Sequence, residues 1–191
     1  NIHAYRQAEP RLMSVKTHYQ NVRTNLEQRK QAVYGPSLKA LDRIVQSYRD
    51  GRTPLGQYVQ ALANVTKGDG LSPSSRIFLR ALNMESGLDF KLVERERTAL
   101  LETLIKHLSD GQIQTLTEQS LAYRSGHLSY GDFYRTLRGL CQKAGVVLSS
   151  YPAMEKYIEY VLLADQIDVE RLNDDIFVLE RLALERSALS Q

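Results

Sequence analysis

Apolar residues recur at steps of three and four along most of this chain, and that spacing predicts amphipathic α-helices. The first stripe lies in residues 10–34 and consists of Leu12, Val15, Tyr19, Val22, Leu26 and Val33, with Arg29 at one of its steps. Pro10 suits the first turn of a helix, and Gly35-Pro36 is typical of a helix end. We therefore expect a long helix over 10–34.

Shorter helices and a second long helix are expected next, separated by turn residues. A proline preceded by serine or threonine, which is typical of a helix start, stands at Thr53-Pro54 and Ser72-Pro73. Glycines stand where the helices should end, because glycine adopts left-handed backbone angles readily. The expected helices are 37–50, one between Pro54 and Lys67, 74–86, and a long one near 88–109.

The sequence also repeats itself. When it is shifted by 75 positions, residues 23–62 align with residues 98–137 without a gap. Eight pairs are identical, namely Leu26/Leu101, Glu27/Glu102, Leu41/Leu116, Tyr48/Tyr123, Arg49/Arg124, Gly51/Gly126, Gly56/Gly131 and Leu62/Leu137. Substituted pairs such as Tyr58/Phe133 keep apolar character at the same helical phase. After a four-residue insertion, Leu88-Asp89-Phe90 falls on Ile167-Asp168-Val169, so a third long helix is expected over 168–189.

These patterns predict an all-α, internally duplicated array of about nine helices, arranged as an elongated bundle or a short α-solenoid-like stack. Residues 1–191 then form a single body of two repeats, about 10–87 and 88–167, followed by the C-terminal helix 168–189. The last helix has a coiled-coil-like seam that is too short to stand alone and needs a partner helix. The seam consists of Val169, Leu172, Ile176, Leu179 and Ala183.

Composition adds little to this picture. The chain is 42% hydrophobic and 25% charged, as in ordinary folded domains, and no apolar run is long enough to span a bilayer. A lone cysteine, Cys141, fits a reducing compartment and equally a secreted protein without disulfides, so the localisation stays open. Because the sequence starts at Asn1, we interpret it as a processed chain or a domain of a longer protein.

Charge is distributed unevenly around a net value of +3. Residues 1–52 hold 10 Lys and Arg against 4 Asp and Glu, whereas residues 151–191 hold 4 against 9. A basic first helix is compatible with nucleic-acid or anionic-surface binding. Its basic residues are spread along the helix rather than gathered in a tract, so nucleic-acid or anionic-surface binding is the less favoured interpretation. They are Arg6, Arg11, Lys16, Arg23, Arg29 and Lys30.

No pattern predicts a catalytic, cofactor-binding or metal-binding residue. The four histidines, His3, His18, His107 and His127, lack the helical spacing of metal ligands. The carboxylates Asp165, Asp168, Glu170, Asp174 and Asp175 lack the spacing of a calcium loop, and we interpret them as a solvated helix start.

The remaining conspicuous residues also have structural interpretations. Cys141 is expected to be a small core residue. The duplicated Tyr-Arg-x-Gly motif, 48–51 and 123–126, is expected to end helices, and Gly56 and Gly131 to allow close helix contacts. Ser129 and Asp132 form a predicted capping box.

We therefore expect a non-enzymatic helical interaction or scaffold module without a cofactor, whose partner is another protein or a second copy of itself. Three alternatives stay open. They are a nucleic-acid or anionic-surface binder that uses the basic N-terminal helix, the helical appendage of a larger enzyme, and an enzyme whose residues meet only in three dimensions.

Overall fold

The computed structural model describes the backbone of residues 2–190 and the side chains of residues 13–190. Within these residues the chain forms nine α-helices, one short 3₁₀ helix and no strand, which confirms the all-α prediction. The side chains of His3, Arg6, Arg11 and Leu12, which entered the sequence predictions, lie outside the described residues.

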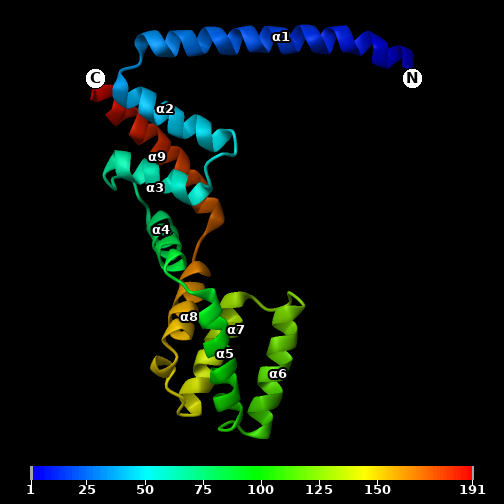
Figure 1. The fold of residues 1–191 in the computed structure, drawn as a ribbon, viewed down its shortest axis with the longest axis vertical. Helices are drawn as coiled ribbons and strands as arrows, with labels where there is room; N and C mark the ends of the chain where they lie inside the picture. Colours follow the sequence, from blue (N-terminus) through cyan, green and yellow to red (C-terminus); the bar gives the residue numbers. More distant parts are fainter. Residues whose placement is uncertain (1, 191) are drawn as a thin grey trace. The chain divides into compact units, whose positions relative to one another are not determined.

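The helices follow the predicted order (Figure 1), but α1 begins at Ile2 rather than at Pro10, where the sequence predicted its start. They are α1 (Ile2–Val33), α2 (Pro36–Arg49), α3 (Leu55–Thr66), α4 (Pro73–Ser86), α5 (Phe90–Ile105), α6 (Asp110–Arg124), α7 (Tyr130–Lys143), η1 (Leu148–Ser150), α8 (Pro152–Ala164) and α9 (Val169–Leu189). α5 is shorter than the predicted 88–109, because the Asp89 side chain accepts the backbone amides of Lys91 and Leu92 and so starts the helix. Lys106 ends it.

The chain divides into two compact units. The first unit contains the residues up to Thr66 together with those from Glu180 onward, and the second contains Lys67–Leu179. Helix α9 therefore contributes its first half to the second unit and its last half to the first unit. The predicted single body over 1–191 stays a prediction.

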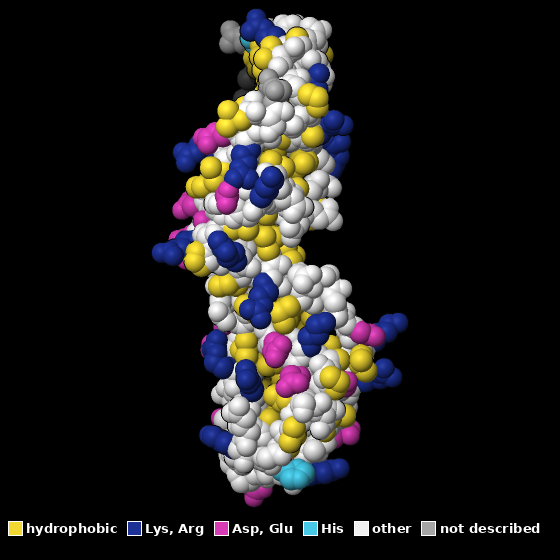
Figure 2. Space-filling view, turned by 90° about the vertical axis from the view of Figure 1, so that its left-hand side faces the viewer, with side chains coloured by type: hydrophobic (Ala, Val, Ile, Leu, Met, Phe, Trp, Pro, Cys, Tyr) yellow, Lys and Arg dark blue, Asp and Glu magenta, His cyan; other side chains and the backbone are white. Residues whose placement is uncertain are grey.

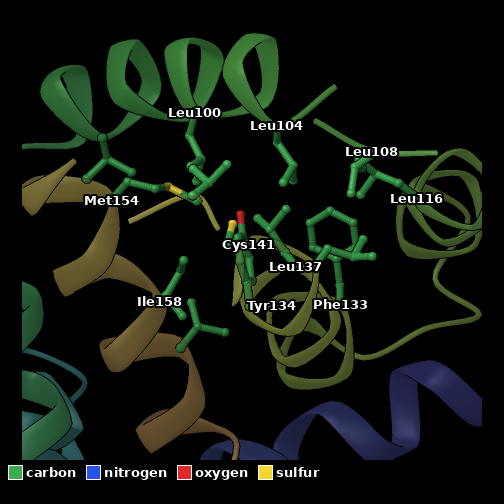
Figure 3. Packing of buried hydrophobic residues seen from close by; sticks show 14 residues of the cluster. Leu100, Leu104, Leu108, Leu116, Phe133, Tyr134, Leu137, Cys141, Met154 and Ile158 are labelled. Atoms are coloured by element: carbon green, nitrogen blue, oxygen red, sulfur yellow. The ribbon is translucent and has the colours of Figure 1, made fainter. Parts of the chain in front are cut away.

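The second unit is a helical bundle in which α8 contacts α4, α5 and α7, and α6 contacts α7. Its core is made of side chains that point toward one another from α5, α7 and α8 (Figure 3). Leu100, Leu137 and Met154 are nearly or completely buried there. Cys141 is also buried, which confirms its interpretation as a core residue.

Both copies of Tyr-Arg-x-Gly end a helix in the same way. Gly51 and Gly126 have φ angles of 72° and 75°, in the left-handed region that favours glycine. The amide after each glycine bonds to a carbonyl five residues back, over 2.9 Å from Arg52 to Ser47 and 2.8 Å from His127 to Ala122. The motif therefore ends a helix in both repeats, as predicted.

The aromatic residues of the motif repeat as well. Tyr48 stacks on Tyr58 with ring centroids 4.1 Å apart and planes 6° apart. Tyr123 stacks on Phe133 with centroids 4.7 Å apart and planes 18° apart. Each ring lies 75 positions from its counterpart, so the duplication seen in the sequence is present in the side-chain packing of both units.

Helix α9 repeats α5 at the predicted shift of 79 positions. Val93, Leu100 and Leu104 of α5 are buried, and so are their counterparts Leu172, Leu179 and Ala183. The seam of α9 is therefore covered by the chain itself from Leu172 to Ala183, while Val169 at its start is exposed. In the first unit, Glu180 accepts a hydrogen bond from the Tyr58 hydroxyl, and Arg186 donates to the Thr66 carbonyl.

The same shift relates two carboxylates that hold helix N-termini within the second unit. Glu96 accepts the amides of Ala153 and Met154 at the start of α8, over 2.7 and 2.9 Å. Its counterpart Asp175 accepts the hydroxyl of Ser75 over 2.8 Å and that of Ser72, the N-cap residue of α4. These bonds neutralise the positive end of each helix.

Candidate interaction surfaces

Among the described residues, no three His, Cys, Asp or Glu side chains are placed to share a metal ion. His107 Nδ1 lies 2.8 Å from the Thr103 carbonyl, and His127 Nδ1 lies 2.8 Å from the Ser125 hydroxyl. Burial raises the pKa of the Cys141 thiol to about 11, which keeps it protonated and unreactive at neutral pH.

The acidic cluster near α9 is only in part the solvated helix start that the sequence predicted. Asp168 does accept the Arg171 amide in the first turn of α9. However, Asp175 is tied to α4 by the bonds described above, and Asp165 pairs with Arg135 over 2.7 Å. The sequence does not show these partners, because Ser72 and Arg135 lie about 103 and 30 positions away.

Gly131 places a further constraint on Asp165. A Cβ atom at Gly131 would overlap the Asp165 carboxylate, which confirms the predicted close contact at this glycine. Ser129 accepts the Asp132 amide over 3.0 Å, and its hydroxyl donates to the Asp132 carboxylate. The predicted capping box is therefore only half formed, and a complete one stands at Ser109 and Gln112 of α6.

The apolar stripe of α1 is uncovered. The described members of the stripe, from Val15 to Val33, are exposed, and Val22 retains 52% of its accessible surface. All five are large apolar residues on one helix, namely Val15, Tyr19, Val22, Leu26 and Val33. Such an exposed apolar stripe, interrupted by Arg29, is typical of an interaction site on an otherwise polar helix.

The stripe has the register of a coiled coil. With Tyr19, Leu26 and Val33 at a positions, the d positions are Val15, Val22 and Arg29. The e positions beside this seam are all basic, namely Lys16, Arg23 and Lys30. The g positions on its other side are His18, Asn25 and Ala32, and none of them is acidic.

A charged hollow of about 750 Å³ lies in the first unit between α1 and α2. Lys30 is among the residues that line it, and its ammonium group pairs with Asp42 over 2.8 Å and with Glu27 over 3.2 Å. The hydrogen bond that Lys30 donates to Asp42 raises the pKa of Lys30. Arg52 pairs with Asp50 over 2.8 Å. Acidic side chains thus neutralise part of the positive charge that lines this hollow. On the face that Figure 2 shows, Lys and Arg side chains are likewise interspersed with Asp and Glu rather than gathered in one patch.

A second hollow, of about 400 Å³, lies in the second unit and is lined by aromatic and acidic residues. Its walls are the rings of Phe90, Tyr130, Tyr157 and Tyr160, its rim carries Glu85 and Asp165, and Val161 and Ala164 complete it. Phe90 meets Tyr157 edge-on with ring centroids 6.4 Å apart. We call this hollow the aromatic pocket.

The tyrosines of the aromatic pocket belong to a connected network. Burial raises the pKa of Tyr160, and the adjacent Glu85 carboxylate, which accepts a hydrogen bond from its hydroxyl, raises it further. Burial also raises the pKa of Tyr157, which hydrogen-bonds Tyr134. The pKa of Tyr134 is raised to about 12. The hydroxyls of Tyr134, Tyr157 and Tyr160 are therefore neutral hydrogen-bond donors at neutral pH.

Sequence reasoning missed the aromatic pocket because its residues come from four separate segments. Phe90 starts α5, Tyr130 starts α7, Tyr157 and Tyr160 lie one turn apart in α8, and Glu85 lies near the end of α4. Only the pair in α8 gives a local signal, and that signal is also typical of a core-facing helix.

Comparisons of this chain with protein-family models, with curated proteins and with solved structures found no match. Among the described residues, no helix combines the length and apolar character needed to cross a bilayer.

Proposed function

We propose that this protein is a helical interaction module that binds an acidic amphipathic helix of another protein along the seam of α1. The observation that carries the proposal is an exposed apolar stripe in heptad register beside an unbroken row of basic e positions. Burying such a stripe against a partner helix removes apolar surface from water and lets Lys16 and Arg23 form interhelical ion pairs, whereas Lys30 already pairs with Asp42 and Glu27.

Charge favours an acidic partner over a second copy of the chain. In a parallel pair of α1 helices, the e positions would face His18, Asn25 and Ala32, which offer no negative charge. In an antiparallel pair, the basic e positions would face one another and repel. A helix with glutamate or aspartate beside its seam can pair with the basic e positions in either orientation.

The seam also favours a helix over a membrane surface. Helices that lie in a membrane interface have a broad apolar face rich in Leu, Phe and Trp. Here the large apolar residues from Val15 to Val33 are confined to a and d positions, and the c and f positions are polar, namely Ser14, Thr17, Asn21, Thr24, Gln28 and Gln31. Such a narrow stripe fits one helix.

The test uses two designed three-heptad peptides with leucine at a and d. One peptide has glutamate at e and g, and its control has lysine there. We expect the glutamate peptide to bind the full chain, as measured by isothermal titration calorimetry, with an affinity that falls as salt rises. The lysine peptide should not bind.

Two variants of the chain locate the interaction. Val22→Asp places a carboxylate in the seam and should weaken binding by roughly 100-fold, the effect of about 3 kcal/mol for an uncompensated buried charge. Met13→Asp is the matched control, because Met13 is also an exposed apolar residue of α1 but lies at a b position, off the seam. Its binding should be unchanged.

The result against the proposal is equally specific. Equal binding of both peptides, or loss of binding in Met13→Asp, would exclude the seam. A dimer of the chain alone that sedimentation velocity detects and that Val22→Asp abolishes would show that the partner is a second copy. Binding to anionic vesicles or to nucleic acid without binding of the glutamate peptide would favour the corresponding surface instead.

A further inference from the structure

We infer that the aromatic pocket of the second unit binds a trimethylammonium group, carried by a small molecule or by a methylated lysine side chain. This site is independent of the α1 seam, since all of its lining residues lie between Glu85 and Asp165. It takes a different kind of ligand from the acidic helix proposed above.

The walls supply the attraction for a cation. Aromatic faces carry negative electrostatic potential, and several rings around one cation attract it more strongly than a single ring does. Phe90 and Tyr157 lie nearly perpendicular, with 76° between their planes, and Tyr160 is tilted by 41° from Tyr157. Tyr130 adds a fourth ring. Rings at different angles line the same open hollow, so several of them can contact one cation.

The rim supplies charge of the right sign. Glu85 and Asp165 are the charged lining residues, and no lysine or arginine is among the residues that line the pocket. Arg135 pairs with Asp165 over 2.7 Å and offsets part of its charge, which leaves Glu85 as the main source of negative potential. An anionic ligand would be repelled here, and a neutral apolar ligand would gain nothing from the rim.

The hydrogen bonds at the rim select among cations. Glu85 already accepts the Tyr160 hydroxyl, and Asp165 already accepts Arg135. A primary ammonium or a guanidinium group must replace its own hydrogen bonds to water when it enters a pocket. A trimethylammonium group has no N–H donor, so it loses no hydrogen bond, and its methyl groups suit aromatic walls. A cavity of about 400 Å³ holds such a head group with room for its chain.

The test compares three ligands by calorimetry and by tyrosine fluorescence of the full chain. Choline and a short peptide with trimethyl-lysine carry the charged head group from the two sources. The third ligand, 3,3-dimethylbutan-1-ol, has the same shape as choline but no charge. We expect saturable binding of at least one trimethylammonium ligand and at least tenfold weaker binding of the neutral isostere. Tighter binding of the peptide would identify a protein side chain as the source.

Substitutions of exposed rings test binding without disturbing the fold. Phe90 and Tyr130 are both more than half exposed, so Phe90→Ala and Tyr130→Ala should leave the fold intact and weaken binding by about 3- to 30-fold each. Glu85→Gln should also weaken binding while keeping the shape of the rim. Phe177→Ala is the matched control, because Phe177 is an exposed ring in the same unit outside the pocket.

Equal affinity for choline and its neutral isostere would overturn the inference, and so would the absence of saturable binding of both charged ligands. Unchanged affinity in Phe90→Ala, Tyr130→Ala and Glu85→Gln would also overturn it, because the ligand would then bind elsewhere.

Discussion

The helices α1 and α5 occupy equivalent places in the two repeats, yet α5 is part of a core and α1 is not. The residues that α5 buries are Val93, Leu100 and Leu104. Their counterparts 75 positions earlier are His18, Asn25 and Arg29. Of the apolar residues in the α1 stripe, Tyr19 and Val22 correspond to the charged Glu94 and Arg97, whereas Leu26 and Val33 correspond to Leu101 and Leu108. A repeat helix that has polar residues at the inward positions of α5 but keeps an apolar stripe can face a different partner.

Helix α9 shows where the corresponding interactions of the first repeat occur. It retains the apolar positions of α5 at a shift of 79, and its Glu180 and Arg186 bond to α3 in the first unit. The positions at which α5 meets its neighbours are thus matched by α9, the last helix, rather than by α1, the first. Because α9 makes these contacts, the first repeat does not need α1 to make them, and the seam of α1 stays exposed.

The largest difference between the two helices should appear on truncation. Leu100→Ala removes a fully buried side chain and should lower the free energy of unfolding by about 2–5 kcal/mol. Asn25→Ala, the equivalent change in α1, should alter it by less than about 0.5 kcal/mol, since Asn25 is exposed. Urea unfolding of both variants measures the difference. Comparable losses would mean that α1 is packed as α5 is.

A smaller effect is expected where the repeats differ in polarity. The buried Tyr58 donates to Glu180, whereas the equivalent positions hold Phe133 and Leu101. Tyr58→Phe should destabilise the chain by about 1–3 kcal/mol, because Glu180 then loses this donor and retains the longer ion pair with Arg49 over 3.7 Å. The double variant Tyr58→Phe with Glu180→Leu copies the second repeat and should recover part of the loss in thermal unfolding. A double variant less stable than Tyr58→Phe would argue against the equivalence of α9 and α5.

Alkaline pH should reveal the burial of Cys141. Its pKa is raised to about 11 in the folded chain from an ordinary value of 9.0, so folding favours the protonated thiol. The associated stability is complete below pH 9.0 and is lost as pH rises toward 11, by up to about 2 kcal/mol.

The matched control for this alkaline loss comes from the first repeat. Thr66 stands there at the position of Cys141, and its hydroxyl bonds to the Ala63 carbonyl over 3.3 Å. Cys141→Thr should therefore be tolerated and should show a shallower loss of melting temperature with pH than the parent chain. Identical pH profiles would contradict a buried thiol.

The smallest of these effects concerns the carboxylates that hold helix starts. Glu96→Gln and Asp175→Asn each keep the shape of the side chain and remove its charge. Each should destabilise the chain by about 0.5–2 kcal/mol, because a charged acceptor at a helix N-terminus becomes a neutral one. Chemical unfolding at low and high salt checks this, and the two losses should be similar if the two sites are equivalent. A loss at only one site would mean that the two carboxylates are not equivalent and that the repeat extends only to the backbone.

Much of the fold follows from local sequence signals. The steps of three and four, Ser72-Pro73 and the glycines at 51 and 126 are each explained by interactions within one helix turn, and the helices formed as these signals predict. The duplication was visible for the same reason, because Tyr48 and Tyr58 lie only ten positions apart and recur as a pair.

The interaction surfaces depend on contacts that local signals do not contain. The stripes of α1 and α9 look alike in sequence, and only the folded chain shows that Leu179 is buried while Val22 is open. The predicted role of the acidic cluster was wrong for Asp175, because its acceptor role depends on Ser72, which is distant in sequence. The aromatic pocket likewise requires four segments to meet.

The most direct test of the central claim is hydrogen–deuterium exchange of the full chain with and without the glutamate peptide. We expect the amides of α5 and of α9 to be protected in the free chain, and the amides of α1 from Val15 to Val33 to exchange quickly. Adding the peptide should protect α1 and leave the other two helices unchanged. If α1 were as protected as α5 in the dilute free chain, or stayed unprotected with saturating peptide, α1 would not carry an open seam.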